Sequence, residues 1–447
     1  MSELCFHHCR NERLTEKARR VAMETPGTYL PRLVDDALAD QMRAFGAVLV
    51  EGPKWCGKTW TATRLARSVA WVADPTGNYT TRRIATLDPF SLLRTSKPVL
   101  LDEWQDAPGL WDAVRMAVDQ TPGPGQYLLT GSATPKEGVT AHSGTGRIAR
   151  LRMWPMSLLE SGESSGVVSV RRLLEGDPPV TATSRLTETQ LIEAILRGGW
   201  PGGLGVALAP AMALPRSYLE SVANSDASRI DSVRRDPIRL AALLASLARN
   251  TATTVANTTL ARDIEISGAA TVSTKTVADY LDVLRRLHVL HEIPAWSPAL
   301  RSPVRLRRSP KRMLVDPSLA AAGMRAGPET LAADRKTFGL VFENLCLRDL
   351  SIYAATTGAT VWHYHDQAEL EADAIIQDRS GRWAGVEIKL GPHQEDSAAA
   401  SLVALGKKMA AAGEPAPSAL VVVVGPGSFA HQRDDGVSVV PIDLLGP

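Results

Sequence analysis

The first third of the chain alternates short apolar runs with longer stretches in which apolar residues recur at helical spacing. The short runs predict buried strands at Ala47–Val50, Ile84–Leu87, Val99–Leu101 and Tyr127–Thr130. The periodic stretches predict helices at Leu33–Phe45, Trp60–Ala70 and Leu110–Val118. Such alternation is typical of an α/β fold with a mostly parallel sheet and helices on both faces, which binds ligands at the carboxyl ends of its strands.

The middle of the chain is mainly helical in pattern. Helices are predicted at Leu191–Leu196, Ile238–Arg249, Leu260–Ile264 and Ser273–Arg286, and a strand at Val289–Ile293. Helix, turn, helix and strand in this order indicate a winged-helix-like segment, whose second helix can enter a DNA major groove. Lys275, Arg285 and Arg286 favour DNA contact, whereas Asp279 and Asp282 on the same helix favour a packing or dimerisation module.

The last third mixes both patterns. It predicts helices at Phe338–Leu350 and Ala398–Ala412, and strands at Val361–His365, Ala374–Gln377, Trp383–Leu390 and Ala419–Val424. The predicted organisation is an N-terminal extension (1–28), a first α/β domain (29–160), a linker rich in Ser, Gly, Glu and Pro (161–186), a helical segment (187–300) and a second α/β domain (301–447).

A phosphate-binding loop follows the first predicted strand. The pattern G-x-x-x-x-G-K-[ST] is matched by Gly52, Pro53, Lys54, Trp55, Cys56, Gly57, Lys58 and Thr59. The two glycines allow the tight turn that points backbone N–H groups at phosphates. We expect Lys58 to reach the β- and γ-phosphates and the Thr59 hydroxyl to bind a magnesium ion.

Two carboxylates end another predicted strand, in the run Pro-Val-Leu-Leu-Asp-Glu at residues 98–103. Asp102 is placed to hold magnesium through water, and Glu103 to orient or deprotonate the attacking water. With the loop, they predict a domain that binds ATP and Mg²⁺ and hydrolyses ATP.

A second set of charged residues lies on the predicted strands of the last third. Glu387 and Lys389 project to the same face because they are two residues apart on a strand, and Asp373 precedes the neighbouring strand. Glu343 on the preceding helix adds a third carboxylate. Such a group can bind a metal ion and position a water, as in nucleases of the PD-(D/E)XK type. The alternative is a set of solvated side chains on an exposed strand.

Composition adds few constraints. The chain has 447 residues, is 44% hydrophobic and 22% charged, and has a formal net charge of +2. No apolar run is long enough to span a membrane and the N-terminus lacks an apolar signal segment, so we expect a cytoplasmic protein without a membrane partner. We interpret Cys5, His7, His8 and Cys9 as part of a frayed extension rather than as a zinc site.

The densest basic run of the chain follows the helical segment. It comprises Arg301, Arg305, Arg307, Arg308, Lys311 and Arg312. These side chains could contact nucleic-acid phosphates, or they could pair with acidic neighbours inside the protein. The sequence alone leaves both interpretations open.

Taken together, the motifs resemble a prokaryotic family of AAA+ ATP-binding proteins whose ATPase domain is followed by a C-terminal module of unknown function. That module looks like a winged-helix-like segment joined to a PD-(D/E)XK restriction-endonuclease-like domain. In the ATPase part the resemblance is carried by Tyr29–Leu33, Gly52–Thr59, Leu101–Gln105, Leu129–Ser132, Gly146–Arg147 and Pro155. In the C-terminal part it is carried by Gly198–Pro201, Lys311–Asp316, Phe342–Asn344, Asp373 and Glu387–Lys389.

The resemblance implies further residue roles. Thr130 or Ser132 would be the polar sensor of the γ-phosphate, and Arg147 an arginine finger that stabilises transition-state charge, with Arg150 and Arg152 as competitors. Our main interpretation is an ATPase whose nucleotide state moves a C-terminal module that binds nucleic acid and could cleave it. The alternative is a nucleotide-dependent switch that binds a protein partner or another copy of itself and has a non-catalytic C-terminal scaffold.

Overall fold

The computed structural model describes residues 29–447, except 136, 137, 139, 232, 270, 300, 303–307 and 428. The cysteines and histidines near the N-terminus therefore lie outside the described residues. The chain divides into two compact units, of which the first ends at Met153 and the second begins at Trp154. Each unit is described by itself below.

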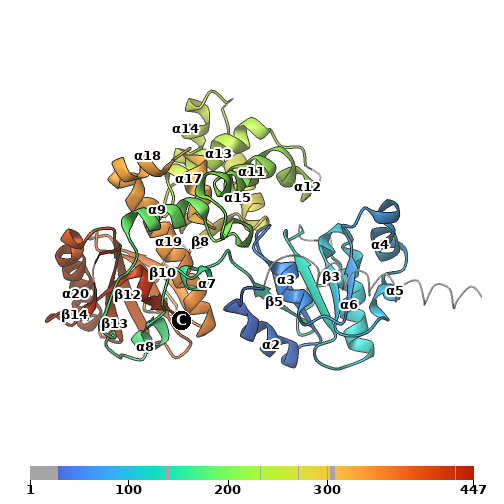
Figure 1. The fold of residues 1–447 in the computed structure, drawn as a ribbon, viewed down its shortest axis with the longest axis horizontal. Helices are drawn as coiled ribbons and strands as arrows, with labels where there is room; N and C mark the ends of the chain where they lie inside the picture. Colours follow the sequence, from blue (N-terminus) through green and yellow to red (C-terminus); the bar gives the residue numbers. More distant parts are fainter. Residues whose placement is uncertain are drawn as a thin grey trace, which may run out of the picture. The chain divides into compact units, whose positions relative to one another are not determined.

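The first unit is built on a parallel five-stranded sheet (Figure 1). Its strands are β1 (Ala47–Glu51), β2 (Ser68–Trp71), β3 (Val99–Asp102), β4 (Tyr127–Gly131) and β5 (Ile148–Arg152). Their order across the sheet is β2-β3-β4-β1-β5. Strand β4 thus lies between the strand that precedes the phosphate loop and the strand that ends in Asp102. All the carboxyl ends meet at one edge because the strands are parallel.

Helices cover both faces of this sheet. They are α2 (Val34–Ala44), α3 (Lys58–Thr63), α4 (Thr76–Leu87), α5 (Pro89–Leu93) and α6 (Gly109–Gln120), with a 3₁₀ turn η1 (Trp104–Asp106). Apolar residues of α4, α5 and α6 share one core with the sheet. Those of α2 and α3 share a second core with its opposite face. The predicted α/β fold of the first domain is confirmed.

Two elements of the first domain differ from the prediction. The helix after the phosphate loop ends at Thr63, and Ser68–Trp71 forms strand β2. Conversely, Ile84–Leu87, predicted as a strand, belongs to helix α4, where Leu87 is 82% exposed. A short apolar run does not by itself distinguish a buried strand from one turn of a helix.

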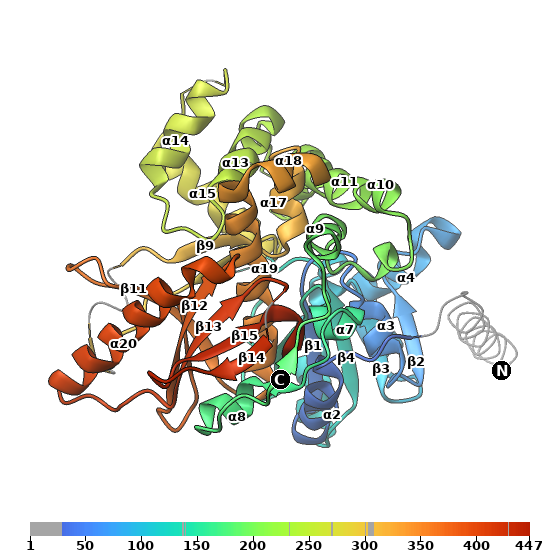
Figure 2. The same ribbon diagram turned by 60° about the vertical axis from the view of Figure 1, so that its left-hand side comes forward.

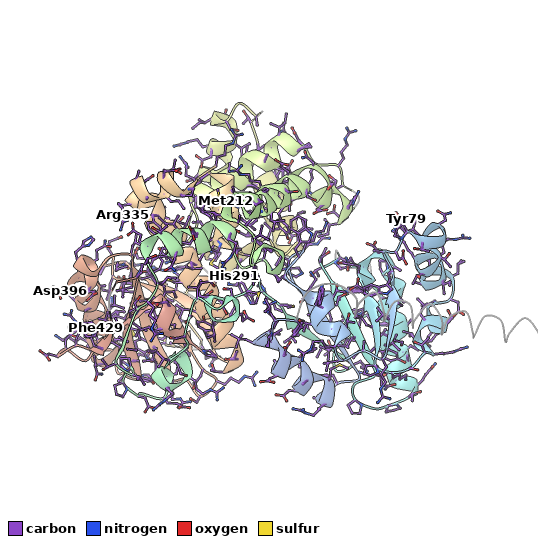
Figure 3. All side chains as sticks on the ribbon, in the orientation of Figure 1. Tyr79, Met212, His291, Arg335, Asp396 and Phe429 are labelled. Atoms are coloured by element: carbon purple, nitrogen blue, oxygen red, sulfur yellow. The ribbon has the colours of Figure 1, made fainter. Side chains whose placement is uncertain are left out.

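The second unit contains most of the helices. They are α7 (Leu158–Ser161), α8 (Val170–Leu174), α9 (Glu188–Arg197), α10 (Leu208–Ala211), α11 (Ala213–Ser221), α12 (Ala227–Arg229), α13 (Pro237–Arg249), α14 (Asn257–Ile266), α15 (Thr274–Arg286), α17 (Pro317–Gly323), α18 (Pro328–Ala333), α19 (Arg335–Thr356) and α20 (Glu395–Ala411). Short helical turns are η2 (Pro201–Gly203), η3 (Val222–Asp226), η4 (Pro392–Gln394) and η5 (Ile442–Leu444). Arg335, labelled in Figure 3, begins α19 and pairs with Glu188 of α9 at 2.7 Å.

A seven-stranded mixed sheet forms one part of the second unit, and the helices α13–α15 lie beyond it (Figure 2). In spatial order its strands are β10 (Thr360–His365), β11 (Glu371–Gln377), β12 (Trp383–Lys389), β13 (Ala419–Val424), β15 (Ser438–Pro441), β14 (Phe429–Gln432) and β7 (Ala182–Thr183). Strands β10, β11 and β12 are antiparallel, and β12, β13 and β15 are parallel. Helix α20 packs on one face of the sheet, and α19 and α8 pack on the other.

The helical segment of the second unit contains the predicted three-helix run. Helices α13, α14 and α15 precede the antiparallel strands β8 (Leu290–Ile293) and β9 (Lys311–Leu314). The Ser273 hydroxyl accepts the Thr276 N–H at 3.1 Å and caps α15. The chain then leaves β8 and joins the edge strand of the large sheet, since the Trp296 N–H donates to the His363 carbonyl at 2.7 Å. The helical segment and the sheet are therefore directly linked.

The segment predicted as a linker, residues 161–186, carries secondary structure. Strand β7 adds to the edge of the large sheet, and β6 (Val168–Ser169) pairs with β16 (Leu445–Gly446). The low periodicity of this segment reflects its short strands, which are too brief to show an alternating pattern. Among the described residues, no helix is long and apolar enough to cross a membrane.

Candidate active site

The phosphate loop lies at the carboxyl end of β1 and leads into α3. A Cβ on Gly52 would come within 2.1 Å of the Met153 carbonyl oxygen, so this position accepts no side chain. Gly57 has φ of 104°, in the left-handed region that favours glycine. The Lys58 side chain is 5% exposed, and its ammonium donates to the Pro53 carbonyl at 2.7 Å across the loop. The Lys58 ammonium thus lies against the backbone of the loop.

Asp102 connects the loop to the neighbouring strands through one carboxylate oxygen. The hydroxyls of Thr59 and Thr130 both donate to Asp102 Oδ1, each at 2.7 Å. Because β4 lies between β1 and β3, Thr130 at the end of β4 bridges the two sides of the site. Burial raises the pKa of Asp102, and the two hydroxyl hydrogen bonds oppose that rise.

Glu103 is held by side chains that follow β3 and β4. The Ser132 hydroxyl donates to Glu103 Oε2 at 2.9 Å, and the Gln105 amide donates to the same oxygen. The backbone N–H of Glu103 donates to the Thr130 hydroxyl at 3.2 Å. Thr130 therefore contacts the Asp102 carboxylate, whereas Ser132 contacts the Glu103 carboxylate. The sequence did not distinguish these two contacts, because Thr130 near the end of β4 and Ser132 just after it are only two residues apart.

The three candidate arginines lie at different places along β5. Arg147 precedes the strand, at the edge of the sheet opposite the phosphate loop, and pairs with Asp119 at 2.8 Å. Arg150 pairs with Glu51 at 3.1 Å. Arg152 ends the strand opposite Glu51, at the edge that carries the loop. Burial lowers its pKa to about 10, against the opposing charge of Glu51. Of this set, Arg152 is therefore the one whose backbone lies at the edge of the sheet that carries the loop.

Two residues that precede α2 brace the loop from outside the motif. Arg32 is 7% exposed and donates to the Cys56 carbonyl at 2.7 Å. Tyr29 donates to Asp35 at 2.6 Å, and its ring lies 4.1 Å from the Arg64 guanidinium. In the sequence this stretch carries only the family resemblance. No local pattern marks Arg32, because its partner, the Cys56 carbonyl, lies in a distant segment of the chain.

Cys56 itself points into the protein. The side chain is fully buried, and its sulfur lies 3.8 Å from the Met153 carbonyl. The thiol is therefore closed to alkylating reagents in the folded state, and it offers no chemistry to a bound phosphate.

The second unit brings together Glu343, Asp373, Glu387 and Lys389 (the C-terminal carboxylate cluster) from α19, β11 and β12. The Lys389 ammonium lies 2.5 Å from Glu387 Oε2 and 3.4 Å from Asp373 Oδ2. The Ile388 N–H also donates to Asp373 Oδ2, at 2.8 Å. These side chains are not solvated on an exposed strand, since Glu387 is only 5% exposed.

A second lysine enters the same cluster. Lys311 of β9 places its ammonium 2.6 Å from Glu343 Oε1 and 3.3 Å from Asp373 Oδ1. The carboxylates raise the pKa of Lys311 even though burial opposes its charge. Although burial works against ionisation, the two lysines hold the pKa of Asp373 down at about 2. Burial raises the pKa of Glu387 to about 8, and the nearby charge of Asp373 adds to the rise.

Several cations proposed for nucleic-acid contact have partners within the second unit. Arg312 pairs with Glu292 at 3.0 Å and donates to the Val255 carbonyl. Arg285 pairs with the same Glu292 at 2.6 Å, and Arg286 pairs with Asp231 at 3.3 Å. Of the basic run, Arg305 and Arg307 lie outside the described residues. For Lys311 and Arg312, the structure favours internal pairing over contact with phosphates.

A buried ion-pair network explains another part of the sequence pattern. Arg348 is paired at 2.8 Å with both Asp316 and Asp349. Asp316 also accepts the Gly199 N–H at 3.0 Å, and Asp349 accepts the Leu158 N–H at 2.9 Å. This network ties α17 and α19 to the start of the second unit, so these residues have a structural role.

Three family models match separate parts of the chain. An AAA domain model matches residues 44–161, and two models described as domains of unknown function, DUF8612 and DUF4143, match residues 188–330 and 338–445. The first α/β unit therefore contains an AAA-type P-loop domain, a class that binds and hydrolyses nucleotides. The models for the rest of the chain name no function.

Comparisons with whole proteins add similarity but no function. Uncharacterized proteins of Mycobacterium tuberculosis and Mycobacterium bovis are each 25% identical over 417 residues, which cover 92% of this chain and 84% of the relative. Among solved structures, a Walker-type ATPase of Pyrococcus abyssi matches with a TM-score of 0.37 and 13% identity, over 65% of this chain and 94% of that one. Thermotoga maritima RuvB matches with a TM-score of 0.27 and 15% identity, over 63% and 88%. Because these TM-scores are low, the two structures support no further conclusion.

Proposed function

We propose that the protein is a magnesium-dependent ATPase whose nucleotide state is transmitted to its C-terminal unit. The observation that carries the proposal is the shared contact of the Thr59 and Thr130 hydroxyls with one oxygen of Asp102, at 2.7 Å each. It joins the phosphate loop, the acidic strand and the strand between them. The atoms that could coordinate a metal ion here are hydroxyl and carboxylate oxygens, the ligands that Mg²⁺ prefers.

Each residue then has one task. The loop N–H groups and Lys58 bind the phosphates, while Thr59 and Asp102 hold the magnesium ion, which neutralises charge on the phosphates when bound. Glu103 releases its hydrogen bonds with Ser132 and Gln105 and binds the attacking water instead. It then accepts a proton from that water. Catalysis rests on positioning and charge stabilisation, without a covalent intermediate.

An arginine would complete the charge stabilisation. Arg152 is the candidate within the same chain, because it ends β5 beside the loop strand. Arg147 lies at the other edge of the sheet, so it would act only on the nucleotide of a second copy of the chain. Self-association is therefore part of the Arg147 hypothesis.

The test of the proposal is ATP turnover by the wild type and Lys58→Ala, with Arg83→Ala as a matched control. Arg83 is an exposed cation of the same unit. Removal of Lys58 should reduce phosphate release at least about a hundredfold, because it binds the transferred group in the transition state. The Arg83 variant should turn over like wild type. Equal rates for wild type and Lys58→Ala would refute the proposal.

The same ATP turnover assay distinguishes two hypotheses for the function of the C-terminal unit. In one, helices α13–α15 bind DNA, and the cluster on α19, β11 and β12 acts as a restriction-endonuclease-like site. In the other, the unit is a non-catalytic scaffold that binds a protein partner. Internal pairing of Lys311, Arg312 and Arg286 favours the scaffold. Stimulation of ATP turnover by duplex DNA, lost steeply with salt, would favour DNA binding.

A further inference from the structure

The C-terminal carboxylate cluster contains the oxygens of a metal site, but two lysine ammonium groups already contact these oxygens. Three carboxylates, those of Glu343, Asp373 and Glu387, face two ammonium groups. Asp373 is the common member, and both of its oxygens are in use. Oδ1 meets Lys311 at 3.3 Å, while Oδ2 accepts the Ile388 N–H at 2.8 Å and meets Lys389 at 3.4 Å.

The Lys311 ammonium has a full set of acceptors in this place. Its contacts are Glu343 Oε1 at 2.6 Å, Asp373 Oδ1 at 3.3 Å and the Asp373 carbonyl at 3.3 Å. An ammonium group has three donors, so this environment satisfies it completely. A magnesium ion would need the same oxygens at about 2.0–2.1 Å. The residues therefore do not fit a divalent metal ion as long as Lys311 keeps this position.

The backbone that presents Lys311 is firmly held. Lys311 lies opposite Ile293 in the β8–β9 pair, and its neighbour Arg312 is fixed by Glu292 at 3.0 Å. The lysine side chain is only 11% exposed. Withdrawal of the ammonium would leave the largely buried Glu343 carboxylate without its cation and Asp373 with Lys389 alone, which is costly.

We infer that Lys311 is a built-in cation that takes the place of a divalent metal ion between Glu343 and Asp373. The C-terminal unit is thus held together by ion pairs, and the cluster accepts a divalent ion only when the Lys311 ammonium is removed. This inference does not depend on ATP hydrolysis in the first unit, so the two can fail separately.

The experiment is Mn²⁺ binding to the full chain without nucleotide, measured by calorimetry and by the shift in Tm. Among the residues that the structure describes, two other places offer carboxylates to Mn²⁺: the phosphate-loop site and the exposed group of His365, Glu369 and Glu371. All proteins therefore carry Asp102→Asn, Glu369→Gln and Glu371→Gln. In this background, Lys311→Met should bind Mn²⁺ at least about a hundredfold more tightly than the chain with Lys311, because a nearby monovalent cation repels a divalent one strongly.

Two variants test the cause. Lys311→Arg keeps the positive charge and should not gain Mn²⁺ affinity, and Glu343→Gln added to Lys311→Met should lose it again. Mn²⁺ should also raise the Tm of Lys311→Met but not that of the chain with Lys311. If Lys311→Met fails to fold alone, refolding with Mn²⁺ should recover it. Two results would overturn the inference. One is tight Mn²⁺ binding by the chain with Lys311, if Glu343→Gln abolishes that binding. The other is a Lys311→Met variant that neither binds Mn²⁺ nor folds in its presence.

Discussion

Both units place aspartates on the strands of a sheet with little exposure to solvent, but the carboxylates meet different partners. Asp102 in the first unit meets neutral hydroxyls, those of Thr59 and Thr130. Asp373 in the second unit meets the ammonium groups of two lysines. Hydroxyls stabilise a carboxylate without cancelling its charge, so Asp102 keeps its attraction for a cation. The lysines of the second unit have already supplied the positive charge.

The comparison shows that a set of residue types does not define a metal site. Both places have acids and a lysine, yet the Lys58 ammonium donates to a backbone carbonyl rather than to a carboxylate. The first site is thus arranged for a ligand that carries both phosphates and a metal ion. In the second, the lysines contact the carboxylates directly. Three predictions, from the largest expected effect to the smallest, would break or sharpen this difference.

The largest effect is expected at Glu103. Glu103→Gln removes the proton acceptor but keeps the size of the side chain, so ATP turnover should fall by about a thousandfold. Affinity for ATP should change little, because Glu103 contacts Ser132 and Gln105 rather than the loop. Phosphate release and equilibrium binding of a fluorescent ATP analogue measure the two quantities separately.

The matched control is Asp36→Asn, which removes an exposed carboxylate of α2 in the same unit. It should leave both quantities unchanged. A Glu103→Gln variant that still hydrolyses ATP at the rate of the wild type would show that the first site does not use this acid as its base.

The second prediction concerns the pH dependence of stability in the C-terminal cluster. The folded-state pKa of Glu387 is raised to about 8 by burial and by Asp373, from a usual value near 4.5. The folded state therefore holds a proton that the unfolded state releases, and stability falls as pH rises from about 4.5 to about 8. The slope is at most about 1.4 kcal/mol per pH unit for one proton. Asp373, with its pKa lowered to about 2, loses its contribution only at much lower pH.

Glu387→Gln cannot titrate, so it should remove much of this slope. The measurement is urea unfolding of the second unit by pulse proteolysis at pH values between 5.5 and 8.5, and the two proteins should diverge by about 2–3 kcal/mol. Glu371→Gln is the control, because Glu371 lies on β11 but is exposed. Parallel pH profiles for wild type and Glu387→Gln would show that the cluster does not retain this proton.

The sequence predicted the first unit well because its signals are local. The phosphate loop is contiguous, and Asp102 and Glu103 follow one buried run. The prediction failed where a short run, such as Ile84–Leu87, fits either a strand or a helix. The three-helix run in the second unit, α13–α15, was also recognisable, because long amphipathic stretches repeat their pattern over several turns.

What the sequence could not give is the pairing between distant segments. Lys311 stood in a run of basic residues, and only the fold shows that it faces Glu343 and Asp373 rather than solvent. The segment 161–186 joins the sheet through strands too short to be seen in the pattern. Such contacts depend on tertiary structure, which local periodicity does not encode.

The smallest predicted effect is at Arg32, and it tests whether the shape of the phosphate loop depends on residues outside the motif. Arg32 donates to the Cys56 carbonyl at 2.7 Å and so holds the backbone of the loop. Arg32→Met should weaken ATP binding about tenfold, since a hydrogen bond from a charged donor contributes roughly 1.5–3 kcal/mol. Arg43→Met is the matched control, because Arg43 lies on α2 and pairs only at the surface with Asp40. Equal ATP dissociation constants for the Arg32 and Arg43 variants would mean that the loop keeps its shape without Arg32. The difference between the two carboxylate sites would then depend only on the loop and the strands that carry it.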